Sequence, residues 1–263
     1  MTLTYDKRIA RLDEFLREDR LIRYGWTGRD ADGRETACLL AALAPETGEA
    51  QSPSACPASI MPEWLASFVP WINDRGTGTA WPAMVRRFAD LAGRWSVITP
   101  VQWDRLRYAA TRIMLEESHR CYDHNKFQGV ATAVHAIIEL FRRAEGGDNP
   151  RLSEWADAST EAREKASAAE VAKLKKPKRI PLIGRLPMDV AINAATWASW
   201  APTPTLTIEE LAQRTIFLAA QAGLKKRNQQ LYGRDEPAAQ ESADRITTTL
   251  FDAIEAQIAV ATK

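Results

Sequence analysis

Residues 126–144, KFQGVATAVHAIIELFRRA, decide the fold class of this chain. Large apolar residues recur there at intervals of three and four: Phe127, Val130, Val134, Ile137 or Ile138, and Phe141. Side chains with this spacing lie on one face of an α-helix. The glycine-rich stretch 146–150, GGDNP, follows and ends the helix. The pattern therefore predicts a long helix that buries one face.

Upstream of this stretch, Thr99-Pro100-Val101-Gln102 encodes another helix start. Threonine is a favourable N-cap, proline fits the first helical position, and a glutamine three residues after the cap completes a capping box. Weaker starts of the same kind involve Pro62 and Pro82. These signals predict helices over roughly 60–69, 80–95 and 100–119. The stretches 44–60 and 72–79, rich in turn-forming residues, are predicted to be loops.

The N-terminal region predicts one clear helix and one ambiguous segment. Tyr5, Ile9, Leu12 and Leu16 are spaced four, three and four apart, which favours an amphipathic helix. Farther on, a turn at 30–33 allows a hairpin in which 21–26 pairs with 34–40. The segment 35–43, ETACLLAAL, is equally good helix because alanine and leucine favour that state, and we expect a helix there.

The last third is again helical in pattern. The stretch 152–172 is rich in alanine and poor in large apolar residues, so tertiary contacts must hold it. Helices are predicted from Pro187 to Trp200 and after a capping box at Thr207. The final helix carries Ile246, Leu250, Ile254 and Ile258. The whole pattern predicts an all-α multi-helix bundle of about eight to nine helices, with two helical lobes as one arrangement.

Composition shifts suggest three regions along the chain. Residues 1–147 form a Trp-rich helical domain in this reading. Residues 148–186 form an Ala-rich helix and a basic, proline-containing linker, and residues 187–263 form a C-terminal helical hairpin. The boundary after 147 follows from the strong helix stop there.

Composition also excludes several classes of protein. The chain has 263 residues, with 35 Lys+Arg against 34 Asp+Glu and a net charge of +1. A protein that coats nucleic acid is usually clearly basic, and a disordered chain combines low hydrophobicity with high net charge. This chain fits neither description. The three cysteines have no CxxC spacing. Without an apolar signal core or a run of about 18–20 apolar residues, we expect a cytoplasmic protein with no membrane contact.

Four stretches carry a resemblance to known proteins: 34–43 (RETACLLAAL), 54–59 (SACPAS), 62–65 (PEWL) and 80–91 (AWPAMVRRFADL). Together they resemble a group of uncharacterised Ala- and Trp-rich proteins of bacterial phages and prophages. The resemblance covers 20–110 and, more loosely, the start of the last helix, and the chain departs from it at 173–204. It implies an accessory role in the phage or bacterial cytoplasm, such as inhibition of a host defence system like CRISPR, and carries over no catalytic residue.

The three histidines lie within seventeen positions and suggest one chemistry. Glu116 and His119 share a helix face, and His135 and Glu139 do so on the next helix. An antiparallel pairing of the two helices would bring these groups together as ligands for zinc or iron. The alternative, which we favour, is that His119 makes a hydrogen bond at a helix end and His135 is a half-buried helix residue. We therefore expect no cofactor.

Two further surfaces are candidates for binding. Lys175, Lys176, Lys178 and Arg179 belong to a basic segment that is able to neutralise nucleic-acid phosphates. No aromatic residue is interleaved with them to stack on bases, which favours a solvated linker. The other surface lies in 71–95, where tryptophan and arginine, the residues typical of binding hot spots, gather. Its members are Trp71, Arg75, Trp81, Arg86, Arg87 and Arg94.

The leading hypothesis is a non-enzymatic accessory protein of a phage or mobile element that binds a bacterial protein or ribonucleoprotein complex. One alternative is a metal-dependent helical enzyme that uses the Glu and His ligands. Another is a helical protein that binds nucleic acid. Composition does not specify an oligomeric state.

Overall fold

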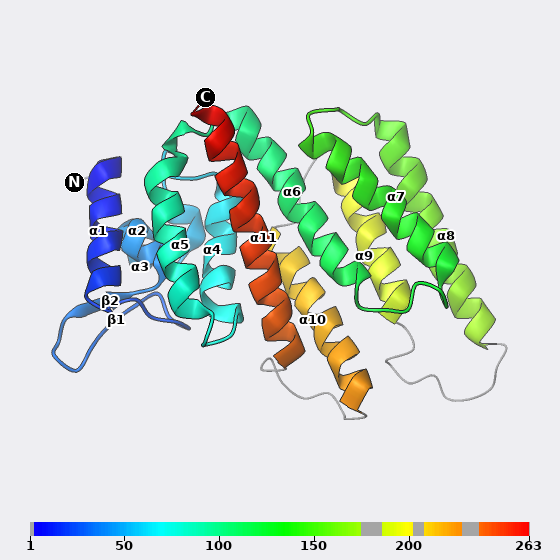
Figure 1. Cartoon of the computed structure of the whole chain (residues 1–263), viewed down its shortest axis with the longest axis horizontal. Coiled ribbons are helices and arrows are strands. Elements are labelled where there is room, and N and C mark those ends of the chain that lie inside the picture. The colour runs from blue at the N-terminus through cyan, green and yellow to red at the C-terminus, as the bar shows by residue number, and fades with distance from the viewer. Residues whose placement is uncertain (1–2, 175–185, 202–207, 228–236, 263) are drawn as a thin grey trace. The chain divides into compact units, whose positions relative to one another are not determined.

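The computed structural model describes residues 3–174, 186–201, 208–227 and 237–262 (Figure 1). The predicted all-α class is confirmed, because these residues contain eleven α-helices, nine of them seven residues or longer, and only one two-stranded sheet. The helices are α1 Tyr5–Arg17, α2 Leu39–Leu43, α3 Pro45–Ala50, α4 Glu63–Arg75, α5 Trp81–Arg94, α6 Pro100–His119, α7 Gln128–Glu145, α8 Leu152–Leu174, α9 Leu186–Trp200, α10 Ile208–Arg227 and α11 Pro237–Ala261. Two 3₁₀ turns, η1 Pro53–Ala55 and η2 Trp95–Val97, and two strands, β1 Thr27–Arg29 and β2 Glu35–Ala37, complete the elements.

The chain divides into two compact units, each described by itself. The first consists of Met1–Trp103, Thr207–Glu209 and Ala243–Lys263, and the second of Asp104–Leu206 and Glu210–Ser242. This division differs from the boundary that the sequence suggests after residue 147. The reason is tertiary: α7, which precedes that point, packs against α8 and α9, which follow it.

In the first unit, α2 lies at the centre of the core. All five of its residues, LLAAL, are fully buried, and α1, α3 and α4 contact it. An aromatic cluster lies elsewhere in this unit, where Phe88 meets Trp95 edge-on at 5.6 Å and Phe251 at 6.3 Å between ring centroids. Trp95, one of the tryptophans of this region, therefore packs in the core.

The ambiguous segment 35–43 turns out to be a strand followed by a short helix. β1 and β2 pair antiparallel, with Thr27 opposite Ala37 and Arg29 opposite Glu35, and α2 begins only at Leu39. The expectation of a helix from residue 35 was wrong because the preceding turn favours the hairpin. The Asp30 carboxylate accepts hydrogen bonds from the backbone N–H groups of residues 32 and 34, and Gly33 adopts a φ of 76°.

The predicted loop at 44–60 contains two helical elements. α3 begins at Pro45, a residue suited to the first helical turn, and η1 follows it. Glu46 in α3 forms a two-pronged ion pair with Arg8 of α1, with N–O distances of 2.8 and 2.5 Å. A contact between residues 38 positions apart thus fixes a helix that local composition does not predict.

The predicted loop at 72–79 begins later than expected, because α4 continues past Pro70 to Arg75. The guanidinium of Arg23 donates to the carbonyl oxygens of Asn73 and Asp74 at 3.1 and 2.8 Å, and to that of Gly76. These carbonyls lie at the helix end, where partners are normally missing. An arginine from a distant segment therefore stabilises the last turn.

In the second unit, α7, α8 and α9 pack against one another (Figure 1). The predicted apolar face of α7 is buried, and so are Val190, Ala194 and Trp197 of α9. The Ala-rich α8 buries Trp155 against Phe141, with ring centroids 4.8 Å apart. No described helix of the chain is long and apolar enough to cross a membrane.

Candidate functional site

The predicted partner-binding residues on α4 and α5 do not form one open surface. Trp71 is buried and stacks on Phe68, with ring centroids 4.7 Å apart. Arg75 and Trp81 are half-buried, and Arg86 is exposed. One of the two tryptophans of the predicted surface, Trp71, therefore belongs to the core.

Arg87 and Arg94 of α5 bind carboxylates within the first unit. Arg87 contacts Asp252 at 2.6 Å and Glu255 at 3.1 Å, and Arg94 contacts Asp90 and, at 3.2 Å, Glu255. Hydrogen bonds from Arg94 and then from Arg87 lower the pKa of Glu255. We call Arg87, Arg94, Asp252 and Glu255 the ion-pair cluster. It joins α5 to α11.

The predicted metal ligands are separated by arginines. Glu116 binds Arg112 and Arg142, each at 2.9 Å, and Glu139 binds Arg142. His135 is exposed. Among the residues that the structure describes, no group of three or more His, Cys, Asp or Glu is arranged to hold a metal ion. Glu116 and Glu139 thus belong to an arginine–carboxylate network, and His135 lies on the surface.

His119 makes its contacts at the end of α6. Its Nδ1 lies 2.9 Å from the Tyr122 hydroxyl, and its ring stacks on that of His124 with centroids 4.0 Å apart. Burial, and then the neighbouring histidines, lower the pKa of His119 to about 4. His119 is therefore neutral at pH 7. The basic candidates Lys175, Lys176, Lys178 and Arg179 lie outside the described residues.

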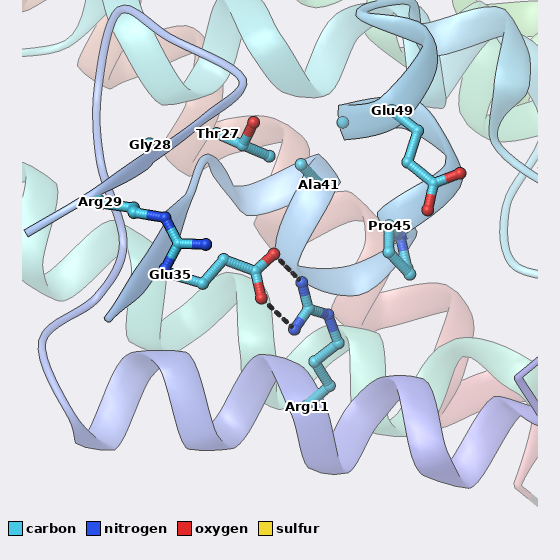
Figure 2. A pocket seen from close by; sticks show the side chains of 9 residues that line it. Arg11, Thr27, Gly28, Arg29, Glu35, Ala41, Pro45 and Glu49 are labelled. Carbon is cyan, nitrogen blue, oxygen red and sulfur yellow. Dashed lines mark hydrogen bonds and ion pairs between the residues drawn. The ribbon is translucent and has the colours of Figure 1, made fainter. Parts of the chain in front are cut away.

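A pocket of about 490 Å³ opens in the first unit between α1, the β-hairpin and α3 (Figure 2). Small-molecule and peptide-side-chain sites commonly have volumes in this range. We call it the hairpin pocket, and it is lined by Arg11, Thr27, Gly28, Arg29, Glu35, Ala41, Pro45, Gly48 and Glu49. It combines four charged side chains with a small, mostly apolar floor.

Arg11 and Glu35 form the central ion pair of the hairpin pocket. The two guanidinium nitrogens of Arg11 lie 2.8 and 3.5 Å from the Glu35 oxygens (Figure 2). The guanidinium also lies over the Phe15 ring, 4.3 Å from its centroid. These contacts hold Arg11 in place while leaving its side chain 20% exposed. The pair forms a fixed polar wall.

Arg29 and Glu49 carry charges that the fold leaves open. The guanidinium of Arg29 donates one hydrogen bond, to the Gly33 carbonyl oxygen at 2.7 Å. Within the described part of the chain, neither residue has an ion-pair partner, and both are exposed. Figure 2 shows Arg29 on the hairpin and Glu49 on α3. The hairpin pocket thus presents one unpaired positive and one unpaired negative group.

Gly48 shapes the floor of the pocket. A Cβ at this position would lie 2.7 Å from Thr27 Cγ2 and 3.1 Å from Ala41 Cβ, distances shorter than normal carbon–carbon contacts. Only glycine lets α3 approach the strand this closely. The Arg8–Glu46 ion pair holds α3 against α1. The hydrogen bonds from Arg8 lower the pKa of Glu46.

Sequence reasoning missed the hairpin pocket because five of its nine lining residues lie in 35–43 and 44–60, two segments whose structure was predicted wrongly. The DADG turn at 30–33 was a usable signal, since it allows a hairpin. The short helix α3 and its pairing with Arg8 gave no local signal.

Comparisons of the chain with protein-family models, with curated proteins and with solved structures find no match.

Proposed function

We propose that this chain is a non-enzymatic binding protein of a phage or mobile element, and that the hairpin pocket binds a bacterial protein or ribonucleoprotein. The observation that carries the proposal is the pair of unpartnered charges, Arg29 and Glu49, on either side of a preformed pocket. Arginine is favoured at binding sites because its planar guanidinium recognises carboxylates with two parallel hydrogen bonds. The phage context comes from the resemblance of residues 20–110.

The groups that face the hairpin pocket favour recognition over reaction. Guanidinium groups do not release protons at ordinary pH, and the central carboxylate is already engaged by Arg11. These properties support a binding role.

The test uses two matched charge reversals in the full-length chain. Arg29→Glu reverses a charge in the hairpin pocket. Arg86→Glu reverses the same charge at an exposed position of α5, outside the pocket. The tagged wild type and both variants are incubated with bacterial lysate, and bound proteins are quantified by mass spectrometry. We expect Arg29→Glu to lower capture of the enriched partner about tenfold, because like charges across an interface repel.

Arg86→Glu should leave that capture unchanged. If Arg86→Glu removes the partner and Arg29→Glu does not, the binding surface lies on α5 and the proposal for the hairpin pocket is wrong. Circular dichroism of all three proteins verifies that the variants keep the helical fold.

A further inference from the structure

The hydrogen-bond pattern of the hairpin shows which backbone groups of β1 are free. The N–H of Cys38 donates to Trp26 O at 2.9 Å, and the N–H of Asp30 donates to Arg34 O at 3.0 Å. In an antiparallel ladder, bonded pairs alternate with non-bonded ones. The pair Gly28 and Thr36 is therefore bonded, and the N–H and C=O groups of Thr27 and Arg29 point away from β2.

The two edges of this small sheet differ in what covers them. On the outer edge of β2, Ala37 donates to Arg20 O at 3.1 Å and accepts from Ile22 N at 2.9 Å. On the outer edge of β1, no hydrogen bond joins the backbone groups of Thr27 or Arg29 to another described residue. An uncovered strand edge is a template for another strand.

The free edge and the hairpin pocket belong to one place in the fold. Thr27, Gly28 and Arg29, which make up the whole of β1, all line the pocket. Figure 2 shows the strand on one side and α3, with Pro45 and Glu49, on the other. A chain that paired with β1 would lie where its side chains reach both unpartnered charges.

We propose that the free edge of β1 binds an extended segment of the partner protein by β-strand addition. The segment carries a carboxylate that meets Arg29 and a basic group that meets Glu49. In this mode, main-chain hydrogen bonds supply affinity and the side-chain contacts supply specificity. The inference rests on the proposed function, since it names the partner's binding segment.

The probe is a blocked pentapeptide with the sequence lysine–threonine–alanine–valine–glutamate, added to the full chain labelled with nitrogen-15. Nuclear magnetic resonance follows the backbone amides of Thr27, Gly28 and Arg29. We expect the amides of Thr27 and Arg29 to shift and their exchange with solvent to slow at saturation. Gly28 is the internal control, because its N–H is already bonded within the hairpin. Unchanged exchange at Thr27 and Arg29 in the saturated complex would overturn the inference.

Two N-methylated forms of the peptide test the ladder itself. One is methylated at the central residue and the other at the second and fourth residues. Since only alternate residues of an added strand bond to its neighbour, one form should bind about tenfold more weakly and the other should keep its affinity. Equal affinities of the two forms would contradict strand addition.

Charge exchange tests the side-chain contacts. Arg29→Glu should bind the original peptide about tenfold more weakly and should prefer a peptide with lysine at both ends. Arg86→Glu, the matched control, should behave as wild type. An Arg29→Glu chain that shows no preference for the lysine peptide would contradict the assigned carboxylate contact.

The outcomes separate this inference from the proposed function. If partner capture depends on Arg29 but the partner leaves Thr27 and Arg29 amide exchange unchanged, the pocket binds without strand addition and only the inference fails. If these amides are protected in the peptide-free chain at high concentration, and sedimentation shows a dimer, the edge pairs with a second copy and the proposed occupant is wrong.

Discussion

The ion-pair cluster and the hairpin pocket both place arginine beside carboxylates, yet they differ in what stays unpaired. In the ion-pair cluster, Arg87 and Arg94 share Glu255, so both guanidinium groups are engaged between α5 and α11. In the hairpin pocket, Arg11 binds the Glu35 carboxylate, whereas Arg29 donates only to a backbone carbonyl oxygen. A cluster of arginines along a sequence therefore does not by itself mark an open surface, because the fold can pair each guanidinium with a carboxylate.

A third arginine, Arg8, is both buried and paired. Arg8 has a side chain that is 1% exposed, and its nitrogens donate to Leu3 O and to both oxygens of Glu46. It lies only three residues before Arg11 on α1. Adjacent turns of one helix thus supply a buried structural pair and a pocket wall, and each has its own expected response to mutation.

The largest effect is expected for Arg8→Met, which keeps most of the buried volume and removes the charge. We expect a loss of about 3 kcal/mol in the free energy of unfolding, at the lower end of the range for a broken buried pair. The lower end applies because the Glu46 side chain is 35% exposed, so water can solvate it. Urea unfolding at pH 7 measures the loss, and Arg17→Met, at an exposed site of α1, is the control.

The same pair predicts a pH dependence. Arg8 lowers the pKa of Glu46 in the folded chain, so the pair contributes stability above the unfolded-state pKa of about 4.3. That contribution should be lost as the pH falls through the folded-state pKa. If Arg8→Met lowers the free energy of unfolding by less than about 1 kcal/mol, the range of exposed ion pairs, the Arg8–Glu46 pair does not anchor α3.

The next effect concerns the second unit, where arginines again engage the carboxylates. Because Arg112 and Arg142 hold Glu116, His119 depends on Tyr122 for its hydrogen bond. We expect His119→Ala to cost about 1–2 kcal/mol at pH 7, the usual loss for one buried hydrogen-bond partner. Thermal unfolding with and without a chelator should give the same midpoint for the wild type. If the chelator lowers the midpoint of the wild type but not that of His119→Ala, the metal-site hypothesis is supported.

The pH dependence of this site has a definite sign. The folded-state pKa of His119 is about 4, below the unfolded value of about 6.5. Between these values the unfolded chain binds the extra proton, so wild-type stability should fall as the pH drops from 6.5 to 4. His119→Ala should lack this component of the pH dependence.

A smaller effect is expected at Gly48, where the pocket needs close approach. Gly48→Ala gains up to about 1 kcal/mol of helix propensity but must displace Thr27 or Ala41, and overpacking costs about 1–3 kcal/mol. We expect a net loss of about 1 kcal/mol. Gly93→Ala in α5 is the matched control, since the nearest atom to its Cβ is 3.9 Å away. Gly93→Ala should stabilise the chain. If both variants change the free energy of unfolding in the same direction, Gly48 is not held in close contact with Thr27 and Ala41.

These contrasts explain how much the sequence could predict. The regular spacing in α7 and in α11, where Ile246 and Leu250 are buried, follows from helix periodicity and was confirmed. The segment 35–43 was not predictable from propensity alone, because hydrogen bonds to Asp30 select a hairpin before it. The short α3 depends on Arg8, a residue 38 positions from Glu46. Local patterns determine long helices, whereas distant ion pairs and turns determine the candidate site.

The smallest effect should come from Glu255→Gln in the ion-pair cluster. Its carboxylate is exposed and shared by Arg87 and Arg94, and exposed ion pairs are screened by salt. We expect a small fall in the thermal midpoint at low salt that disappears at high salt. Because Arg94 and Arg87 lower the pKa of Glu255, wild type and variant should converge as the pH falls through that pKa. Partner capture should stay at the wild-type level, since the hairpin pocket is untouched. A Glu255→Gln chain that captures more partner would mean that the freed arginines bind it, and the distinction between the paired and unpaired surfaces would fail.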